Sequence, residues 1–320
     1  MLQPAMHKPR DISPLLDLEI MQALAALNFR FDTLSHATLP RIRAARAALP
    51  PVALSDLVER VDHVVPERPP VQVRVHRAKA ASGKLPCIYW MHGGGLVLGT
   101  NRIDDPRFDR WCPRLDCAGV SVDYALAPEA PYPQPLEDCY AGLRWLYQNA
   151  ESLNIDAARI GIGGSSAGAG LAAGLALLAR DRAELPIAFQ ALIYPMIDDR
   201  QITFSSQWND PVWPPQANRF GWDCYLRDLG DAAVPVYAAA ARATNLEGLP
   251  PTFICVGALD GFSDEDIDYA TRLRHAGVPT ELHVYPGAPH GFDALTPNTA
   301  IAKQGARDLE AWLSTQLRER

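Results

Sequence analysis

The sequence predicts an α/β fold in which a central, mostly parallel sheet of eight strands is flanked by helices. Two observations favour this class: short apolar segments alternate with helical patterns, and turn residues separate them. Continuous apolar strands indicate a sheet that helices cover on both faces. With 320 residues, 48% of them hydrophobic, the chain can bury a large core.

The amino-terminal part differs from the rest of the chain. Residues 14–27 and 39–48 follow amphipathic helical patterns joined by short polar breaks, and strand patterns begin at about residue 58. We therefore divide the chain into an amino-terminal helical segment, residues 1–55, and a larger α/β part, residues 56–320.

Eight strands are expected in the larger part. The first two alternate apolar and polar residues, as a hairpin at a sheet edge would, and the other six are continuous apolar runs. In chain order they are residues 59–65, 71–77, 85–91, 119–123, 159–163, 189–194, 252–256 and 281–285. Helices are expected at residues 136–149, 167–182, 267–276 and 301–317.

Residues 199–247 interrupt this alternation. They contain no convincing strand and are rich in aromatic residues and proline, including Trp208, Trp213 and Trp222. Ligand sites in parallel α/β sheets lie at the carboxyl ends of the strands. We expect this insertion to cover such a site together with the amino-terminal helices.

Charge and hydropathy exclude two classes of partner. The formal net charge is −7 and no run of Lys or Arg exceeds two, so we expect no nucleic-acid partner, which would need a concentrated basic face. No apolar stretch approaches the roughly 18 to 20 residues of a membrane span. Residues 1–8 lack the charged and apolar regions of a signal peptide.

The six cysteines are scattered, without the close pairing that marks a zinc site, so no metal is expected. Cys87 and Cys255 lie inside apolar strand patterns and are interpreted as small core residues. A reducing, cytoplasmic setting fits this usage of cysteine.

A serine lies between two glycines in Gly164-Ser165-Ser166-Ala167-Gly168, at a predicted strand-to-helix junction. A sharp turn there would point the Ser166 hydroxyl outward, as a nucleophile requires, and the glycines leave room for the strained backbone. The alternative is a glycine-rich helix start with two capping serines. Ser165 lacks glycines at the required offsets.

A serine nucleophile needs a base, and three histidines follow Ser166 in the chain. His275 lies on a predicted helix face near two arginines, and His283 lies within an alternating strand. His290 lies between proline and glycine in the loop after that strand, where its side chain can reach a cleft. His290 is therefore the predicted base.

The acid that orients the base is predicted to be Asp260, which follows the strand at residues 252–256. Asp198 and Asp199 follow another strand and are serious competitors. Three further acids, Asp264, Glu265 and Asp266, resemble first-turn residues of the next helix, where negative charge favours the helix dipole.

Three glycines follow the strand at residues 85–91, in His92-Gly93-Gly94-Gly95. Bare amides at Gly93, Gly94 and Gly95 could approach a substrate oxygen, and the Ala167 amide would add a further donor. The alternative is a flexible glycine turn. His92 is interpreted as a residue that holds this loop, because it precedes the nucleophile.

These motifs resemble the hormone-sensitive-lipase family of α/β-hydrolases. The resemblance rests on residues 92–95, 123–129, 164–168, 257–260 and 290–292, which occur in the order of that family. It implies an α/β-hydrolase fold, a Ser166–Asp260–His290 triad and an oxyanion hole from Gly93, Gly94, Gly95 and Ala167. It also implies a helical cap formed by residues 1–55 and 199–247.

Three departures from the family pattern are visible. Ser165 stands where the family usually has Asp, or Thr in one branch, and Ala169 breaks the second glycine pair. Residues 261–263 read Gly-Phe-Ser where Pro-Leu-Arg is common. None removes a catalytic group, but a missing charge beside the nucleophile can change the pH profile.

The function that these observations predict is a cofactor-free carboxylesterase acting on short acyl esters of small molecules. The same triad would serve an amide, carbamate or lactone, and the sequence does not separate these bonds. A ligand receptor on a hydrolase scaffold is the third reading, although such receptors commonly lose the catalytic histidine. The strand at residues 281–285 could end the sheet and pair with a second copy, so a homodimer is possible.

Overall fold

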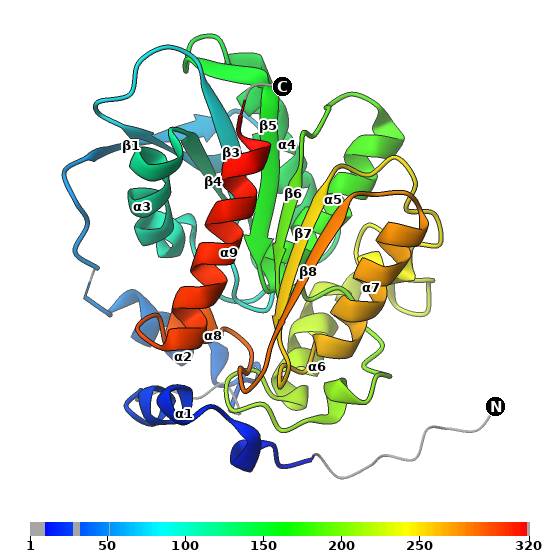
Figure 1. Ribbon diagram of the computed structural model, residues 1–320. Helices are drawn as coiled ribbons and strands as arrows, with labels where there is room; N and C mark the ends of the chain where they lie inside the picture. The colour runs from blue at the N-terminus through cyan, green and yellow to red at the C-terminus, as the bar shows by residue number, and fades with distance from the viewer. Residues whose placement is uncertain (1–9, 28–32, 51, 319–320) are drawn as a thin grey trace.

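The computed structural model describes residues 10–27, 33–50 and 52–318. Residues 1–8, on which the signal-peptide assessment rests, lie outside these ranges. The sheet has eight strands in the order β1-β2-β4-β3-β5-β6-β7-β8, which confirms the predicted class (Figure 1). The strands are β1 (Val58–Val65), β2 (Val71–Ala78), β3 (Leu85–Met91), β4 (Ala118–Asp123), β5 (Ile155–Ser165), β6 (Gln190–Ile193), β7 (Thr252–Gly257) and β8 (Thr280–Tyr285).

The predicted edge hairpin is confirmed. Strand β1 pairs antiparallel with β2, and β2 pairs antiparallel with β4. The remaining pairs, from β4 through β8, are all parallel. The carboxyl ends of the parallel strands therefore meet at one end of the sheet, the lower end in Figure 1.

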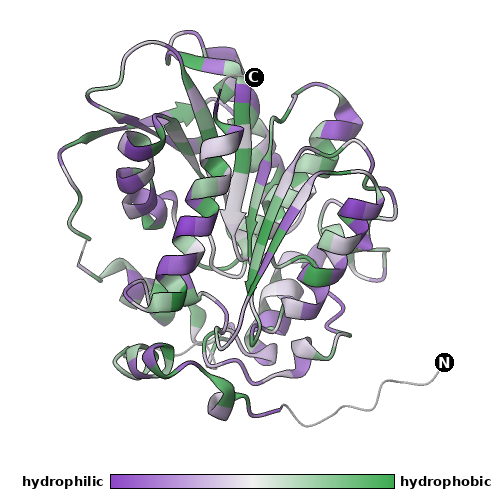
Figure 2. Cartoon of the chain, in the orientation of Figure 1, coloured by the Kyte–Doolittle hydropathy of each residue, from purple (hydrophilic) through white to green (hydrophobic). Residues whose placement is uncertain are grey.

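Helices cover both faces of the sheet. One face carries α3 (Asp105–Leu115) and α9 (Ala300–Gln316), and the other carries α4 (Gln134–Asn149), α5 (Ala167–Arg182) and α7 (Ser263–His275). The central strands are mostly apolar and the helices carry polar residues outward, so the sheet separates two hydrophobic clusters (Figure 2).

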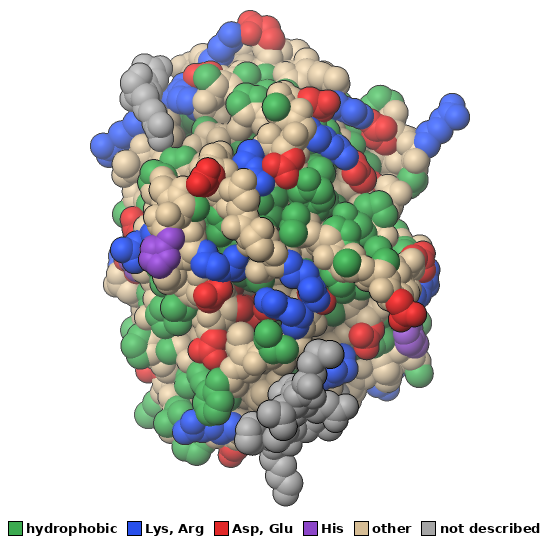
Figure 3. All heavy atoms as spheres, turned by 90° about the vertical axis from the view of Figure 1, so that its right-hand side faces the viewer, with side chains coloured by type: hydrophobic (Ala, Val, Ile, Leu, Met, Phe, Trp, Pro, Cys, Tyr) green, Lys and Arg blue, Asp and Glu red, His purple; other side chains and the backbone are tan. Residues whose placement is uncertain are grey.

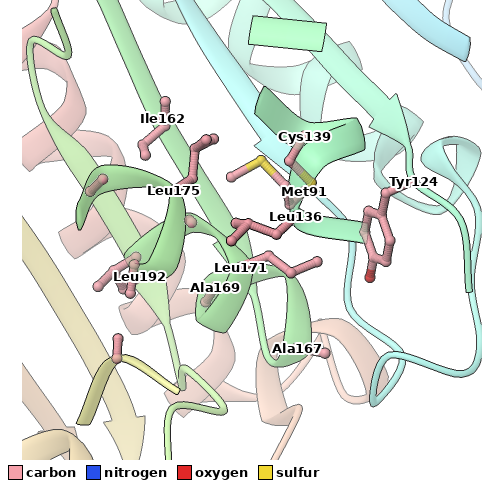
Figure 4. Packing of buried hydrophobic residues seen from close by; sticks show 14 of the residues in the cluster. Met91, Tyr124, Leu136, Cys139, Ile162, Ala167, Ala169, Leu171, Leu175 and Leu192 are labelled. Atoms are coloured by element: carbon pink, nitrogen blue, oxygen red, sulfur yellow. The ribbon is translucent and has the colours of Figure 1, made fainter. Parts of the chain in front are cut away.

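The helix α5 is buried along most of its length. Its side chains Ala169, Leu171 and Leu175 pack among Leu136 of α4 and residues of the sheet (Figure 4). Ala169, one of the departures from the family pattern, is fully buried in this contact. The central strand and helix that carry Ser166 are thus held rigidly by the core.

Two expectations about helices are wrong. The segment 14–27 forms a 3₁₀ turn, Ser13–Leu15, and a separate helix α1, Leu18–Ala25. The break occurs because the Asp17 carboxylate accepts the amides of Glu19 and Ile20 at 2.9 and 3.1 Å and so starts a new helix. The second difference is α3, which was not predicted because Pro113 lies inside it and obscures the helical pattern.

The amino-terminal segment and the insertion lie at the same end of the sheet (Figure 1). The insertion contains α6 (Pro215–Tyr225), and the amino-terminal segment contains α2 (Leu39–Ala47). Arg43 of α2 donates to the Val97 and Ala127 carbonyls at 2.9 and 2.8 Å and pairs with Glu129. Arg10 pairs with Trp208 in a parallel β-bridge, which joins the two segments directly.

The face shown in Figure 3 carries basic, acidic and hydrophobic side chains interspersed. Within the described ranges, no helix combines the length and hydrophobicity that a membrane span requires.

Candidate active site

Ser166 lies between β5 and α5 in a strained backbone conformation, with φ 56° and ψ −123°. The turn is possible because glycine lies on both sides of it. A Cβ at Gly164 would lie 2.4 Å from the Gly168 carbonyl carbon, and one at Gly168 would lie 2.2 Å from the Met91 oxygen. The two glycines therefore allow the helix to cross closely over the strands. Ser166 lies at the N-cap position of α5, but its side chain makes no capping hydrogen bond, which argues against a serine that serves only as a cap.

The three predicted residues come together at the carboxyl ends of the strands. His290 Nε2 lies 2.8 Å from Ser166 Oγ, and His290 Nδ1 lies 2.7 Å from Asp260 Oδ2. All three side chains are buried. Asp260 Oδ1 also accepts the Phe262 amide at 2.9 Å, so both carboxylate oxygens are held by hydrogen bonds. In this position His290 Nε2 can accept the proton of Ser166 while His290 Nδ1 keeps its own proton and donates a hydrogen bond to Asp260.

The competing acids have other partners. Asp198 pairs with Arg200 at 2.7 Å, and Asp199 pairs with Arg242 at 2.6 Å. Asp264 accepts the Ser205 amide at 2.8 Å, and Glu265 accepts the Asp198 amide at 3.3 Å. None of these contacts reaches His290.

The other histidines have the roles expected of them. His275 is exposed at the end of α7, and His283 lies 2.7 Å from the Glu281 carboxylate on the edge strand. His92 is buried, stacks on Tyr124 and lies 2.9 Å from the Gly93 carbonyl through Nδ1. Burial lowers the pKa of His92 to about 4, so it stays neutral and holds the glycine loop.

The imidazole of His290 is enclosed by aromatic rings and acids. Tyr194 and Phe262 contact it edge to face, with ring centroids 4.7 and 4.9 Å from its own. Burial lowers the pKa of His290, but the carboxylates of Asp260, Asp210 and Asp293 raise it more, and the net pKa lies above 6.5. These carboxylates thus stabilise the imidazolium that forms when His290 accepts a proton.

The glycine loop lies directly against the Ser166 turn. A Cβ at Gly93 would lie 3.4 Å from Ser166 Cβ, and Gly94 and Gly95 have φ values of 135° and 59°. No hydrogen bond from these three glycine amides to a described residue is present. The amide of Ala167, first residue of α5, has no partner within the helix. Gly93 therefore lies against the Ser166 turn, and the amides of Gly93, Gly94, Gly95 and Ala167 remain the candidates for an oxyanion hole.

Two residues of the insertion contact the site: Asp210, which was not predicted, and Trp213, one of the tryptophans of the insertion that was expected to cover it. Asp210 accepts the His290 amide at 2.8 Å, and the Trp213 ring packs on Gly95, where a Cβ would lie 2.1 Å from it. An isolated Asp in an aromatic loop carries no distinctive sequence signal. Only the folded chain brings residue 210 beside residue 290.

The buried carboxylate of Asp266 in α7 predicts a stability effect. Neither oxygen has a hydrogen-bond partner among the described residues, and burial, followed by Glu265 and Asp260, raises the pKa of Asp266 well above 3.8. The folded state then binds a proton that the unfolded state releases, so this group destabilises the fold increasingly as pH rises above 3.8. We expect Asp266→Ala to raise the free energy of unfolding by about 1 to 3 kcal/mol at pH 8, and less at pH 4.

Urea unfolding at the two pH values measures this difference. Asp268→Ala is the matched control, because Asp268 lies on the same helix, exposed, and pairs with Arg272. We expect it to change the free energy of unfolding by less than about 0.5 kcal/mol. A change in the free energy of unfolding of Asp266→Ala that is the same at pH 4 and at pH 8 would contradict the prediction.

The site consists of protein side chains and amides. Within the part of the chain that the structure describes, no group of three or more His, Cys, Asp or Glu side chains could hold a metal ion. The arrangement suits nucleophilic attack by a serine on a carbonyl carbon, with amides beside the oxygen that becomes negative.

The chain is similar to known α/β-hydrolases along most of its length. Residues 88–294 match the α/β-hydrolase fold family. The carboxylesterase NlhH of Mycobacterium tuberculosis is 33% identical over 301 residues, which cover 91% of this chain and 92% of NlhH. The esterase LipI of the same organism is 31% identical over 295 residues, 90% of this chain and 91% of LipI.

Solved structures agree with this placement. A bacterial heroin esterase superposes with a TM-score of 0.87 at 39% identity, covering 96% of this chain and 99% of that chain. The esterase LipW from Mycobacterium marinum has a TM-score of 0.85 at 34% identity, covering 98% and 99%. The chain therefore belongs to the α/β-hydrolase fold family, and its resemblance to the hormone-sensitive-lipase branch is confirmed.

Proposed function

We propose that this protein is a serine carboxylesterase that hydrolyses short-chain acyl esters of small molecules without a cofactor. The observation that carries the proposal is the position of His290, within hydrogen-bond distance of both Ser166 and Asp260. The relatives named as esterases and carboxylesterases support the ester bond over an amide, carbamate or lactone. The complete Ser-His-Asp set argues against a receptor.

In the proposed reaction, Ser166 Oγ attacks the ester carbonyl carbon while His290 Nε2 accepts its proton. Asp260 keeps the other proton on Nδ1 and stabilises the imidazolium. The amides of residues 93–95 and of Ala167 donate to the carbonyl oxygen as it becomes negative. His290 then protonates the leaving alcohol, and water hydrolyses the acyl-enzyme with the same base.

Three further assignments accompany this proposal. Residues 1–55 and 199–247 form the cap of a catalytic domain at 56–320; the Arg10–Trp208 bridge and the Trp213–Gly95 contact support this division. The six cysteines, all free thiols and buried, suit a cytoplasmic setting. Because β8 is an edge strand of the sheet, its outer edge can pair with the same strand of a second copy and so form a homodimer.

The pH dependence of hydrolysis tests the proposal. The base must be neutral to accept the serine proton, and the pKa of His290 lies above the ordinary 6.5. We therefore expect kcat/KM for a short-chain p-nitrophenyl ester to fall as pH decreases, with its midpoint above pH 6.5. A rate that stays flat from pH 8 to pH 5 would exclude His290 as the base.

A further inference from the structure

The insertion supplies one buried carboxylate that touches the proposed base. Asp210 is 1% exposed, and its Oδ2 accepts the backbone amide of His290 at 2.8 Å. Its Oδ1 accepts the amides of Val212 and Trp213 at 2.7 and 3.0 Å. One side chain therefore binds three amides, one of them on the proposed base and two on the insertion itself.

The three amides around Asp210 fit an ionised carboxylate better than a side-chain amide. Both oxygens face N–H donors, and only an ionised Asp presents acceptors on both sides; an Asn would turn its NH₂ group toward at least one donor. Burial, followed by Asp260, raises the pKa of Asp210 to about 6, while the imidazolium of His290 and the amides of His290 and Trp213 lower it. Asp210 is therefore mostly ionised at pH 7 to 8.

The short segment 210–213 joins two parts of the site. At one end Asp210 holds the backbone of His290, and at the other the Trp213 ring packs on Gly95 of the glycine loop. The Trp213 amide is bound to the Asp210 carboxylate at 3.0 Å. Moving this segment would thus displace the base and the glycine loop together.

We propose that Asp210 is a positioning residue for His290, through which the insertion fixes the base and places a second negative charge beside its imidazolium. The proposal rests on His290 being the base, as argued above. A backbone contact alone would fix the loop, but a charge this close also stabilises the protonated imidazole that forms during each transfer. Asp210 therefore affects the rate through His290 and does not itself touch the substrate.

The charges that face His290 come from several elements. Asp260 approaches from the loop after β7, Asp293 from α8 (Phe292–Leu295) and Asp210 from the insertion. Tyr194, after β6, donates to Asp293, and Arg107 of α3 pairs with Asp293 at 3.3 Å. Since Arg107 already compensates Asp293, the removal of Asp210 leaves Asp260 as the main opposing charge.

The experiment compares Asp210→Asn with Asp264→Asn in the full-length enzyme. Asp264 is the matched control, because it also binds an amide of the insertion, that of Ser205 at 2.8 Å, but does not contact His290.

We expect Asp210→Asn to lower kcat/KM by about 10-fold, the loss of one charge-assisted hydrogen bond. We also expect the acid limb of its pH profile to move to lower pH by at least about 0.5 units, because a negative charge near the imidazolium is lost. Asp264→Asn should leave the limb in place.

An acid limb that does not move in Asp210→Asn would overturn the proposal, even if the rate falls, because a purely structural contact lowers the rate alone. Should Asp210→Asn fail to fold, Asp210→Ser gives the same measurement with a small, uncharged acceptor. His290→Gln tests the triad itself, separately from the role of Asp210. If that variant keeps the wild-type rate and acid limb, the triad itself fails, whatever the Asp210 variants do.

Discussion

Ser166→Ala is expected to lower kcat for a short-chain p-nitrophenyl ester by about 10⁴-fold or more, leaving only the catalysis that binding and the oxyanion donors provide. The reason is the loss of the hydroxyl that lies 2.8 Å from His290 Nε2. Alanine should fit the strained turn as a smaller side chain on the same backbone. Steady-state kinetics and labelling with a serine-directed phosphonate measure the loss, and the circular dichroism spectrum confirms the fold.

Ser165→Ala is the matched control for this substitution. Ser165 is the adjacent residue, is equally buried, and occupies the last position of β5. Its hydroxyl makes no contact with His290, so we expect activity within a few-fold of wild type and full phosphonate labelling. If Ser165→Ala abolished labelling while Ser166→Ala retained it, the nucleophile would be Ser165 and the assignment of Ser166 would be wrong.

The sheet was predictable because its signal is local. Most of the parallel strands are runs of apolar residues, and strand boundaries were correct within a few residues, except that β5 starts at Ile155 instead of residue 159. The first residues of β5 were missed because the polar Asp156 interrupts the apolar pattern after Ile155. Helix α3 was missed for a related reason, since Pro113 hides an amphipathic helix that packing nevertheless stabilises.

The site was partly predictable because backbone constraints leave traces in sequence. Gly164 and Gly168 are required by close approaches of less than 2.5 Å, so the position of Ser166 could be inferred from glycine spacing. His290 could be inferred from chain order and from its place after a strand, whereas Asp260 was favoured over Asp198 and Asp199 but not separated from them by the sequence. The roles of Asp210 and Trp213 could not be inferred, because they depend on how a strandless insertion packs against loops that are distant in the chain.

Asp260→Asn is expected to lower kcat by about 10³- to 10⁴-fold with a smaller change in KM. The carboxylate lies 2.7 Å from His290 Nδ1 and holds the proton on that nitrogen, which leaves Nε2 free to accept from Ser166. An amide in this place can donate to Nδ1, which favours the wrong tautomer and removes the charge opposite the imidazolium. Steady-state kinetics across pH 6 to 9 measure both effects.

Asp198→Asn separates this role from that of the strongest competing acid. Asp198 also follows a strand, is 3% exposed and pairs with Arg200 at 2.7 Å, so its loss removes a buried charge of the same kind. We expect a lower melting temperature for this variant but kcat within a few-fold of wild type, because no contact joins Asp198 to His290. A large fall in kcat for Asp198→Asn beside a mild one for Asp260→Asn would transfer the orienting role to Asp198. Only the geometry at His290, and not the local sequence around either acid, decides between them, since both follow a strand and both are buried.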